Sequence, residues 1–183
     1  MREEIPLIQV NRLMNCGTLA IITASDGSRS TITPCAWNMP ASKEPPLLFI
    51  ALSAKHFSFK AIQKSKEFVV NIAPWSLMEK MLICAKASGS EMDKFKESKL
   101  TAIKSKTLKV TPKIDECIGN LECKLVDSRE IGDHFILTGQ VLFGEADNKY
   151  FKDGIWDTSK TDLIFHLGGE YFFKSSPYFK FER

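Results

Sequence analysis

The stretch TITPCAWNMPASKEPPLLFIALSAKHFSFKAI, residues 31–62, carries the pattern that decides how this chain folds. It starts as a strand rich in β-branched residues and loses its regular alternation at residues 33–38. Pro34 and Pro40 in this part of the chain donate no backbone hydrogen bond. A partly unpaired strand edge of this kind offers its free N–H and C=O groups to a flat heteroaromatic ring, with Trp37 near enough to pack. A β-bulge at a barrel corner explains the irregularity equally well.

The second half of the stretch has a different character. LLFIAL, residues 47–52, is a continuous apolar run that predicts a strand buried on both faces. A helix is predicted over residues 56–65, and the unpaired N–H groups and positive dipole at its start suit an anion. The polar residues gathered there are Ser53, Lys55, His56 and Ser58, a serviceable phosphate site. In the alternative interpretation Ser53 only caps the helix and Lys55 is solvated. Together, the irregular edge and the polar loop suggest a nucleotide-like ligand.

The rest of the chain reads mainly as β structure. Strands are predicted over residues 17–24, 29–38, 67–72, 120–126 and 135–144, and a hairpin over 163–174. Ser76 and Glu79 form an S-x-x-E capping box, which predicts a helix running to about Lys86. Many short strands with two or three helices indicate a closed antiparallel barrel with flanking helices. We expect a single domain covering residues 1–183.

Composition narrows the classes of function. The 25 basic and 22 acidic residues give a net charge of +3, too balanced to indicate binding to nucleic acid or to an anionic membrane. The acidic start MREEIPLIQV does not resemble a signal peptide, and five cysteines without a C-x-x-C pair fit buried thiols in a reducing compartment. We therefore expect a cytoplasmic protein without a metal site. The dinucleotide, phosphate-loop, zinc-protease and serine-hydrolase motifs are absent, and no catalytic residue is assigned.

The order and spacing of several segments resemble one known family. They are TPCAWNMPASKEPPLLFIAL, SAKHFSFKAI, EFVVNI, SGSEMDKF, LECKL, GDHFILTGQV and LIFHLGGEYF. Together they resemble the flavin reductase-like proteins with an FMN-binding split barrel, and among these the flavoredoxin group. The resemblance covers the whole chain and implies a homodimer of Greek-key split barrels with FMN near the subunit interface.

The resemblance also implies roles for individual residues. The segment that lines the flavin ring, largely through main-chain atoms, corresponds to Thr33, Pro34, Cys35, Ala36, Trp37 and Asn38, and the phosphate loop corresponds to residues 53–58. The group has Arg and Thr where this chain has Lys55 and Ser58; both replacements keep a donor, although lysine lacks the arginine fork. Asn71 and Lys94 match recurrent positions near the cofactor. His134 is expected at the dimer interface or a barrel corner, and His166 and Tyr171 lie in a segment that folds near the flavin.

Three functions remain open from the sequence. The first is an NAD(P)H-dependent FMN oxidoreductase that passes electrons to free flavin, ferric complexes or a partner protein, with NADH or NADPH as donor. The second is a flavoredoxin-like electron carrier with tightly bound FMN and no dedicated nicotinamide site. The third is a split barrel without cofactor that serves as an interaction module. Cys35 has no activating neighbour in sequence and is expected to pack, with its backbone meeting the flavin. The aromatic tail from Tyr171 to Phe181 favours a homodimer.

Overall fold

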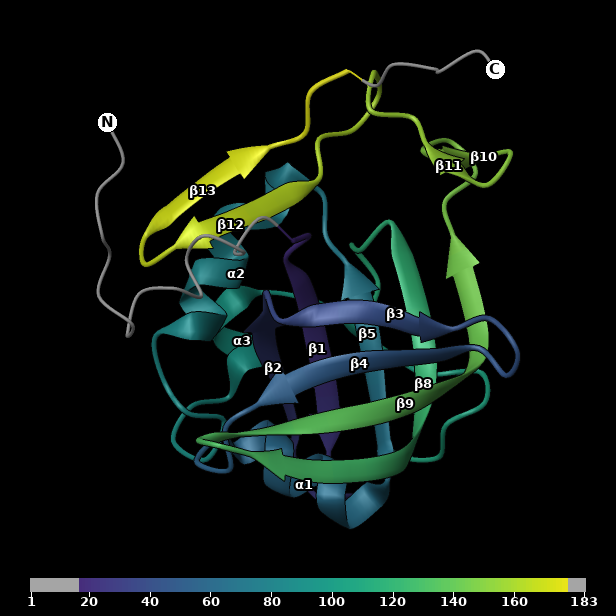
Figure 1. Ribbon diagram of the computed structural model, residues 1–183. Helices are drawn as coiled ribbons and strands as arrows, with labels where there is room; N and C mark the ends of the chain where they lie inside the picture. Colours follow the sequence, from purple (N-terminus) through teal and green to yellow (C-terminus); the bar gives the residue numbers. More distant parts are fainter. Residues whose placement is uncertain (1–16, 178–183) are drawn as a thin grey trace, which may run out of the picture.

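The structure is a computed structural model that describes residues 17–177, and Figure 1 shows a curled sheet with helices on its outside. The strands of the main sheet are β1 (Ala20–Ser25), β2 (Ser30–Cys35), β3 (Asn38–Ser42), β4 (Leu47–Leu52), β5 (Glu67–Ile72), β8 (Gly119–Ile131) and β9 (His134–Ala146). The helices are α1 (Phe57–Ser65), α2 (Met78–Ala85), α3 (Lys94–Ser98) and a 3-10 turn, η2 (Trp75–Leu77). Short hairpins pair β6 (Ala102–Ile103) with β7 (Lys113–Ile114), β10 (Phe151–Lys152) with β11 (Ile155–Trp156), and β12 (Ile164–Gly168) with β13 (Tyr171–Lys174). Within residues 17–177, no helix is long and apolar enough to cross a membrane.

The seven strands of the main sheet lie in the order β2-β1-β5-β8-β9-β4-β3, and each neighbouring pair is antiparallel. The sheet curls into a barrel, which brings its two edge strands toward each other (Figure 1). These edge strands, β2 and β3, also follow one another along the chain. The predicted mainly-β barrel with flanking helices is therefore confirmed. The predicted single strand over residues 29–38 is wrong in one respect, because the chain leaves one sheet edge after Cys35 and joins the other at Asn38.

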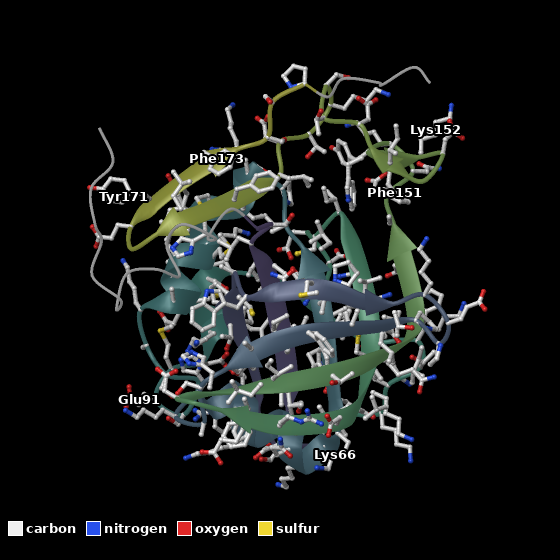
Figure 2. All side chains as sticks on the ribbon, viewed as in Figure 1. Lys66, Glu91, Phe151, Lys152, Tyr171 and Phe173 are labelled. Carbon is white, nitrogen blue, oxygen red and sulfur yellow. The ribbon has the colours of Figure 1, made fainter. Side chains whose placement is uncertain are left out.

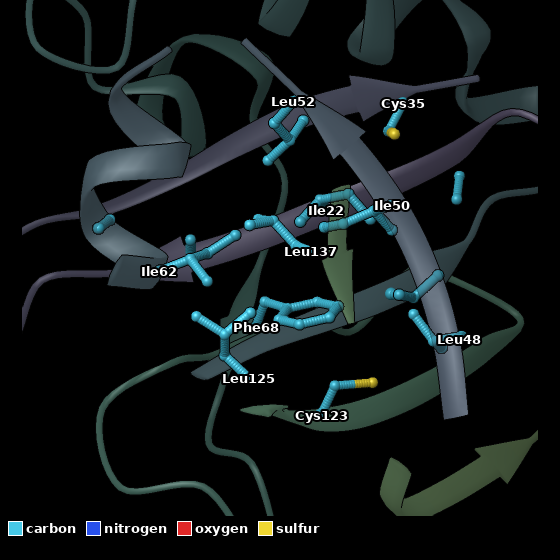
Figure 3. Close-up of a cluster of buried hydrophobic side chains, with 14 residues drawn as sticks. Ile22, Cys35, Leu48, Ile50, Leu52, Ile62, Phe68, Cys123, Leu125 and Leu137 are labelled. Atoms are coloured by element: carbon cyan, nitrogen blue, oxygen red, sulfur yellow. The ribbon is translucent and has the colours of Figure 1, made fainter. Parts of the chain in front are cut away.

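The interior of the barrel is one apolar cluster to which both halves of the sheet contribute. Figure 3 shows Phe68 at its centre, with Ile22 and Ile50 from β1 and β4, and Ile62 from α1, on its sides. The ring of Phe68 leaves no room for a side chain on β9, since a Cβ at Gly139 would lie 2.3 Å from its Cζ atom. The core thus fixes glycine at this position.

A second apolar cluster covers the outer face of β1. Ile21 and Ile32 of the sheet pack there with Met81 and Cys84 of α2. Every residue of β1 is consequently buried, which explains its content of isoleucine and alanine.

The prediction that residues 47–52 are buried on both faces is wrong. In β4 only alternate residues, Leu48, Ile50 and Leu52, are buried, and Leu47, Phe49 and Ala51 remain half-exposed on the outer face. No helix in the described part of the chain packs on that face (Figure 1). The apolar run therefore has an outer face that the barrel itself leaves partly uncovered.

The start of α2 also differs from the prediction. Ser76 lies inside the 3-10 turn η2, and within the described chain neither η2 nor α2 has a side-chain capping hydrogen bond. The predicted capping box of Ser76 and Glu79 is wrong, because Trp75 starts the turn immediately after Pro74 and leaves Ser76 no capping position. The helix itself ends at Ala85, one residue from the predicted end.

The long connection between α3 and β8 is held by two carboxylates, of which one is fully buried and one partly buried. Glu122 of β8, which is fully buried, accepts hydrogen bonds from the backbone N–H groups of Lys106 and Thr107 at 2.7 Å each and from the Thr107 hydroxyl at 2.6 Å. Glu67 accepts the N–H groups of Lys109 and Val110 at 2.9 and 3.0 Å. These carboxylates satisfy amides that no ladder pairs, and so they fix the loop against the barrel.

Candidate functional site

The connection between β2 and β3 is a sharp corner held by side chains. Asn38 donates from its amide nitrogen to the carbonyl oxygens of Thr18 and Cys35, at 2.9 and 2.8 Å. The Trp37 carbonyl accepts the N–H of Ala51 in the neighbouring strand β4 at 2.9 Å. The corner therefore has a defined conformation, and it lies where the two edges of the sheet meet. The amide of Asn38 is occupied by these contacts.

A cavity of about 430 Å³ lies on one side of this corner and is called the cationic cavity below. Its walls come from the end of β2, the start of α1, the end of α2 and the loop that leads to α3. The residues that line it are Thr33, Pro34, Lys55, His56, Phe57, Ser58, Cys84, Ala85, Lys86, Ala87, Ser88, Gly89, Glu91 and Lys94. Glu91 lies on the exposed loop at its rim (Figure 2).

The charges of the cationic cavity are mainly positive. Lys55 and Lys86 are exposed, whereas Lys94 is only 5% exposed. Burial lowers the pKa of Lys94, although the nearby Cys84 thiol acts in the opposite direction. Burial, followed by the charges of His134 and Lys94, also lowers the pKa of His56. Burial is the main cause for both groups, and at His56 the nearby positive charges add to it; an anion in the cavity would relieve both effects.

Ser58 provides a hydroxyl group inside the cationic cavity. It is the second residue of α1 and is only 1% exposed, yet its Oγ atom has no hydrogen-bond partner among residues 17–177. Buried hydroxyls without a partner are rare in native proteins and call for a ligand or a water. The start of α1 adds unpaired backbone N–H groups, since its N-cap residue, His56, makes no capping hydrogen bond through its side chain in the described chain.

Ser53 does not have the capping role of the alternative interpretation. Its Oγ accepts the Lys55 N–H at 3.4 Å, and its carbonyl accepts the His56 N–H at 3.0 Å. Ser53 therefore shapes the turn that leads to the helix, but it does not cap α1 and does not line the cationic cavity.

A second cavity, of about 310 Å³, lies on the other side of the corner and is called the ring cavity below. It shares Pro34 and His56 with the cationic cavity, so the two cavities are adjacent. The residues that line it are Pro34, Cys35, Ala36, Trp37, Ala51, Leu52, His56, His134, His166, Gly168 and Gly169. Its floor is thus the irregular edge that the sequence singled out.

The ring cavity brings together the three histidines of the chain, which lie far apart in sequence. His56 precedes α1, His134 starts β9 and His166 lies in β12. The imidazole of His134 packs against the Trp37 indole with 4.8 Å between ring centroids, and its Nδ1 lies 2.8 Å from the Asp133 carboxylate. No cluster of three or more histidine, cysteine or acidic residues within residues 17–177 has the arrangement of a metal site.

Cys35 lies in the wall of the ring cavity, but its thiol is turned to the backbone. The Sγ atom donates to the carbonyl oxygens of Trp37 and Ala51, at 3.4 and 3.8 Å. Burial raises the pKa of the Cys35 thiol to about 11, so the thiol is protonated near neutral pH. This environment is that of a packing residue and differs from that of a reactive thiolate.

Asn71 is not part of either cavity. It is fully buried in β5, where its amide nitrogen donates to the Ile21 carbonyl at 2.8 Å and its Oδ1 accepts the Ile114 N–H at 3.0 Å and the Asn120 amide at 2.8 Å. These contacts tie β5 to β1, β7 and β8. The structure therefore separates Asn71 from the other residues that the resemblance associated with the cofactor.

Several residues of the site could not be singled out from the sequence. The loop over residues 86–89 closes the cationic cavity, and Gly169 closes the ring cavity beside His166, which the resemblance had already associated with the flavin. Gly89 packs so closely on β2 that a Cβ there would lie 2.1 Å from the Thr31 Oγ1 atom. The Gly89 within SGSEMDKF was the available signal, since a glycine in a polar loop often marks a close backbone approach.

Comparison with known proteins identifies this arrangement. Residues 13–166 match the family model described as flavin reductase like domain. An uncharacterized protein of Archaeoglobus fulgidus is 32% identical over 136 residues, which cover 73% of this chain and 74% of that protein. The crystal structure of an FMN-binding protein from Thermus thermophilus with bound 1-cyclohex-2-enone has a TM-score of 0.85 at 19% identity, covering 100% of this chain and 98% of that chain. Flavoredoxin of Desulfovibrio vulgaris has a TM-score of 0.86 at 19% identity, covering 98% and 96%.

The structural likenesses define the class of fold as the split barrel of flavin reductase-like proteins, as the sequence predicted. The match of the family model over residues 13–166 also shows the family, because it spans most of the 183 residues. The chain belongs to the flavin reductase like domain family.

Proposed function

We propose that this protein binds FMN, with the phosphate in the cationic cavity and the isoalloxazine ring in the ring cavity. The observation that carries the proposal is the pairing of two adjacent cavities that are lined by different groups. One contains Lys55, Lys94 and the unpartnered Ser58 hydroxyl, and the other has an apolar floor built from a strand edge. A ligand with a phosphate at one end and a flat ring at the other fits both.

The phosphate would be held by three kinds of donor. Lys55 and Lys94 supply positive charge, the Ser58 hydroxyl supplies a neutral donor, and the first N–H groups of α1 supply the positive end of the helix dipole. Because Lys94 is almost fully buried, its interaction with the phosphate is less screened than that of the exposed Lys55. We therefore assign Lys94 the stronger electrostatic role and Lys55 the steering role.

The ring would lie along residues 34–37. Pro34 and Ala36 offer apolar surface, and the corner offers main-chain groups at the sheet edge. Trp37 and His134 form one wall, and His166 forms another. The Cys35 thiol is already engaged with two carbonyl oxygens, so the backbone at this position meets the ligand. Thr33 lies between the two cavities at the edge of the cationic one.

The proposed activity is an NAD(P)H-dependent FMN oxidoreductase that passes electrons to free flavin, ferric complexes or a partner protein. FMN, when bound, accepts hydride and releases electrons singly or in pairs, and the protein supplies binding, orientation and access. The second candidate is a flavoredoxin-like electron carrier, which the structural likeness to flavoredoxin of Desulfovibrio vulgaris favours. The two differ in whether a nicotinamide nucleotide reduces the bound flavin directly.

Two measurements test these proposals in order. Purified protein is first titrated with FMN while its fluorescence is followed, and we expect one FMN per chain with visible flavin absorbance. Colourless protein that takes up no FMN at tens of micromolar would contradict the binding proposal and leave an interaction module. The loaded protein is then titrated anaerobically with NADH and with NADPH. Rapid bleaching identifies the oxidoreductase, whereas bleaching only by dithionite identifies the carrier.

We also propose that the working unit is a homodimer. The half-exposed outer residues of β4, Leu47 and Phe49, lie beside Met39 of β3, which is 56% exposed, and this apolar sheet face continues to Trp37 at the ring cavity. Contiguous apolar surface of this kind is typical of an interface. Tyr171 and Phe173 project from β13 (Figure 2), whereas Tyr178, Phe179 and Phe181 of the aromatic tail lie outside the described residues. Sedimentation equilibrium should give twice the 20.6 kDa chain mass, and a monomer at micromolar concentration would contradict the proposal.

A further inference from the structure

The amine of Lys94 is covered by protein but has no partner in it. Among residues 17–177 two lysines are buried, Lys94 at 5% exposure and Lys113 at 8%. The ammonium of Lys113 forms an ion pair with the Glu145 carboxylate, whereas the Nζ atom of Lys94 has neither a hydrogen bond nor an ion pair within the described chain. Buried lysines are almost always paired, so an unpaired one indicates a group that meets a ligand.

The Nζ atom of Lys94 is accessible from the cationic cavity, which this residue lines. In the described chain, the side-chain atoms that are fully buried without a partner are the hydroxyl oxygens of Thr31, Ser58, Thr111 and Thr158 and the Nδ1 atom of His166. The Nζ atom of Lys94 also lacks a partner but is not one of these atoms. It is therefore not fully buried, and a molecule in the cavity can reach it.

The environment of Lys94 favours a nucleophilic amine. Burial lowers the pKa of Lys94, against a smaller opposite effect of the Cys84 thiol, so the neutral form of the amine is more populated than it would be in water. Desolvated lysines of this kind are the ones that form Schiff bases with carbonyl compounds in proteins. The ammonium form attracts a phosphate, and the neutral form has the lone pair that attacks a carbonyl carbon.

The cationic cavity has room for more than a phosphate group. Its volume of about 430 Å³ lies within the roughly 300–1,000 Å³ of pockets that enclose whole small ligands. Lys55 and Lys86 supply positive charge on its exposed side, the Ser58 hydroxyl supplies an unpartnered donor, and Phe57 supplies apolar surface. A small molecule with a phosphate and a flat ring therefore fits inside the cavity, next to the amine of Lys94.

We propose that the cationic cavity binds phosphorylated aldehydes and that Lys94 captures them as an imine. The lone pair of Nζ attacks the carbonyl carbon, the carbonyl oxygen leaves as water with the two amine hydrogens, and a C=N double bond joins Lys94 to the ligand. No electrons are transferred to another molecule, so the step needs no oxidant or reductant. The capture itself depends on the protein alone, whereas exclusion of FMN by the captured aldehyde rests on the proposed function, in which the FMN phosphate occupies the same cavity.

Pyridoxal 5′-phosphate is the probe, since it combines an aldehyde, a phosphate and one flat ring. It is incubated with the full-length, flavin-free protein, the imine is fixed with borohydride, and the modified lysines are identified by peptide mass spectrometry. We expect about tenfold more adduct at Lys94 than at the exposed Lys86, because the bound phosphate holds the aldehyde beside Lys94. Pyridoxal, which lacks the phosphate, should need roughly ten- to a hundredfold higher concentration for the same labelling of Lys94. Inorganic phosphate should slow the labelling by pyridoxal 5′-phosphate.

Two variants separate the amine from the charge of the cavity. Lys94→Arg keeps a positive charge but removes the nucleophile, and it should abolish the main adduct without increasing the labelling of other lysines. Lys86→Arg is the matched control, because Lys86 lines the same cavity at an exposed position, and it should be labelled at Lys94 as the wild type is. If Lys94→Arg does not fold, the peptide map of the wild-type protein decides the question alone.

Three results would overturn the proposal: adduct spread evenly over Lys94 and the exposed lysines, equal labelling of Lys94 by pyridoxal and its phosphate, or labelling that inorganic phosphate does not slow. Saturation with FMN should also protect Lys94, and protein labelled at Lys94 should no longer bind FMN. If inorganic phosphate protects Lys94 but FMN does not, the capture stands and the placement of the FMN phosphate in this cavity is wrong. Failure of the proposed function is thus distinguishable from failure of this inference.

Discussion

Replacing Ser58 with alanine should have opposite effects on folding and on cofactor binding. The Ser58 hydroxyl is buried in the cationic cavity without a partner among residues 17–177. In the flavin-free protein it is a desolvated polar group without a protein partner, whereas in the proposed complex with FMN it would donate to the phosphate. Removing it therefore relieves a cost in one state and removes an interaction in the other.

The magnitudes follow from the environment of the hydroxyl. A buried unsatisfied polar group costs about 1–3 kcal/mol, and alanine is also favoured over serine in a helix by up to about 0.5 kcal/mol. Ser58→Ala should thus raise the unfolding free energy of the flavin-free protein by about 1 kcal/mol or more, or about 2–4 °C in Tm for each kcal/mol in a chain of this size. A hydrogen bond to a charged phosphate contributes about 1.5–3 kcal/mol, so FMN should bind roughly ten- to a hundredfold more weakly.

The assay combines thermal or chemical unfolding of flavin-free protein with a fluorescence titration of FMN. Thr111→Val is a matched control, because the Thr111 hydroxyl is also buried without a partner in the described chain. Unlike Ser58, Thr111 lines neither the cationic cavity nor the ring cavity. The control should gain similar stability and bind FMN as the wild type does. If Ser58→Ala binds FMN within twofold of the wild type, Ser58 does not contact the phosphate and the placement of FMN in the cationic cavity is wrong.

Four further predictions concern other parts of the molecule. Lys55→Ala should weaken FMN about tenfold and riboflavin hardly at all, since an exposed lysine makes a screened contact with the phosphate; paired titrations test this, and an unchanged preference for FMN would place Lys55 elsewhere. Cys35→Ala should keep FMN binding and most NAD(P)H-driven turnover, within about tenfold, because the thiol is protonated and bonded to carbonyl oxygens; a thousandfold loss with FMN still bound would instead indicate a thiol–flavin relay. Burial and nearby cations lower the pKa of His56 in the free protein, and the phosphate of FMN should raise it, so FMN binding should take up a proton at His56 and its affinity should increase as the pH falls. Equal binding heats in two calorimetry buffers of different ionisation enthalpy would contradict this prediction. Glu122→Gln should lower the unfolding free energy at pH 7 by about 3 kcal/mol. Burial raises the pKa of Glu122, but the hydrogen bonds from Thr107 and Lys106 outweigh this effect and hold that pKa below its ordinary value. The stabilisation is therefore present at neutral pH and is lost as the pH falls through the folded-state pKa. Urea unfolding should show that the variant loses less unfolding free energy between pH 7 and pH 4 than the wild type does.

The strands of the barrel could be predicted from the sequence because their signal is local. Alternation in residues 120–126 and the apolar content of residues 17–24 depend on neighbours a few positions away. The error at β4 has a physical cause: an apolar run shows that a surface is to be covered, but it does not show whether the same chain covers it. The partition of residues 29–38 between opposite sheet edges could likewise not be predicted, since only the strand order of the whole sheet places β2 and β3 at its two edges.

The candidate site divides in the same way. Residues 33–37 lie at the end of a predicted strand, and residues 55–58 lie at a predicted helix start. Because these two segments are close in sequence, the sequence could place them together. The convergence of His56, His134 and His166 depends on where three separate elements end, and nothing in the local pattern indicates it. Asn71 shows the opposite case, in which a position that resembles a cofactor contact is used to hold strands together. A family resemblance transfers positions, whereas only contacts show what each side chain does.

The corner between β2 and β3 explains why one segment governs both the fold and the proposed site. A sheet that curls without joining its two outer strands leaves two edges with unpaired main-chain groups, which in most proteins invite aggregation. Here Pro34 removes one donor from the edge, and the Asn38 amide ties the corner to Thr18 and Cys35, so the edge cannot extend by adding a strand. The main-chain groups that remain at this edge line the ring cavity of about 310 Å³, and they suit a planar ligand better than another strand. The irregular residues 33–38 therefore lie at the break between the two sheet edges, and the proposed ring site lies at the same break.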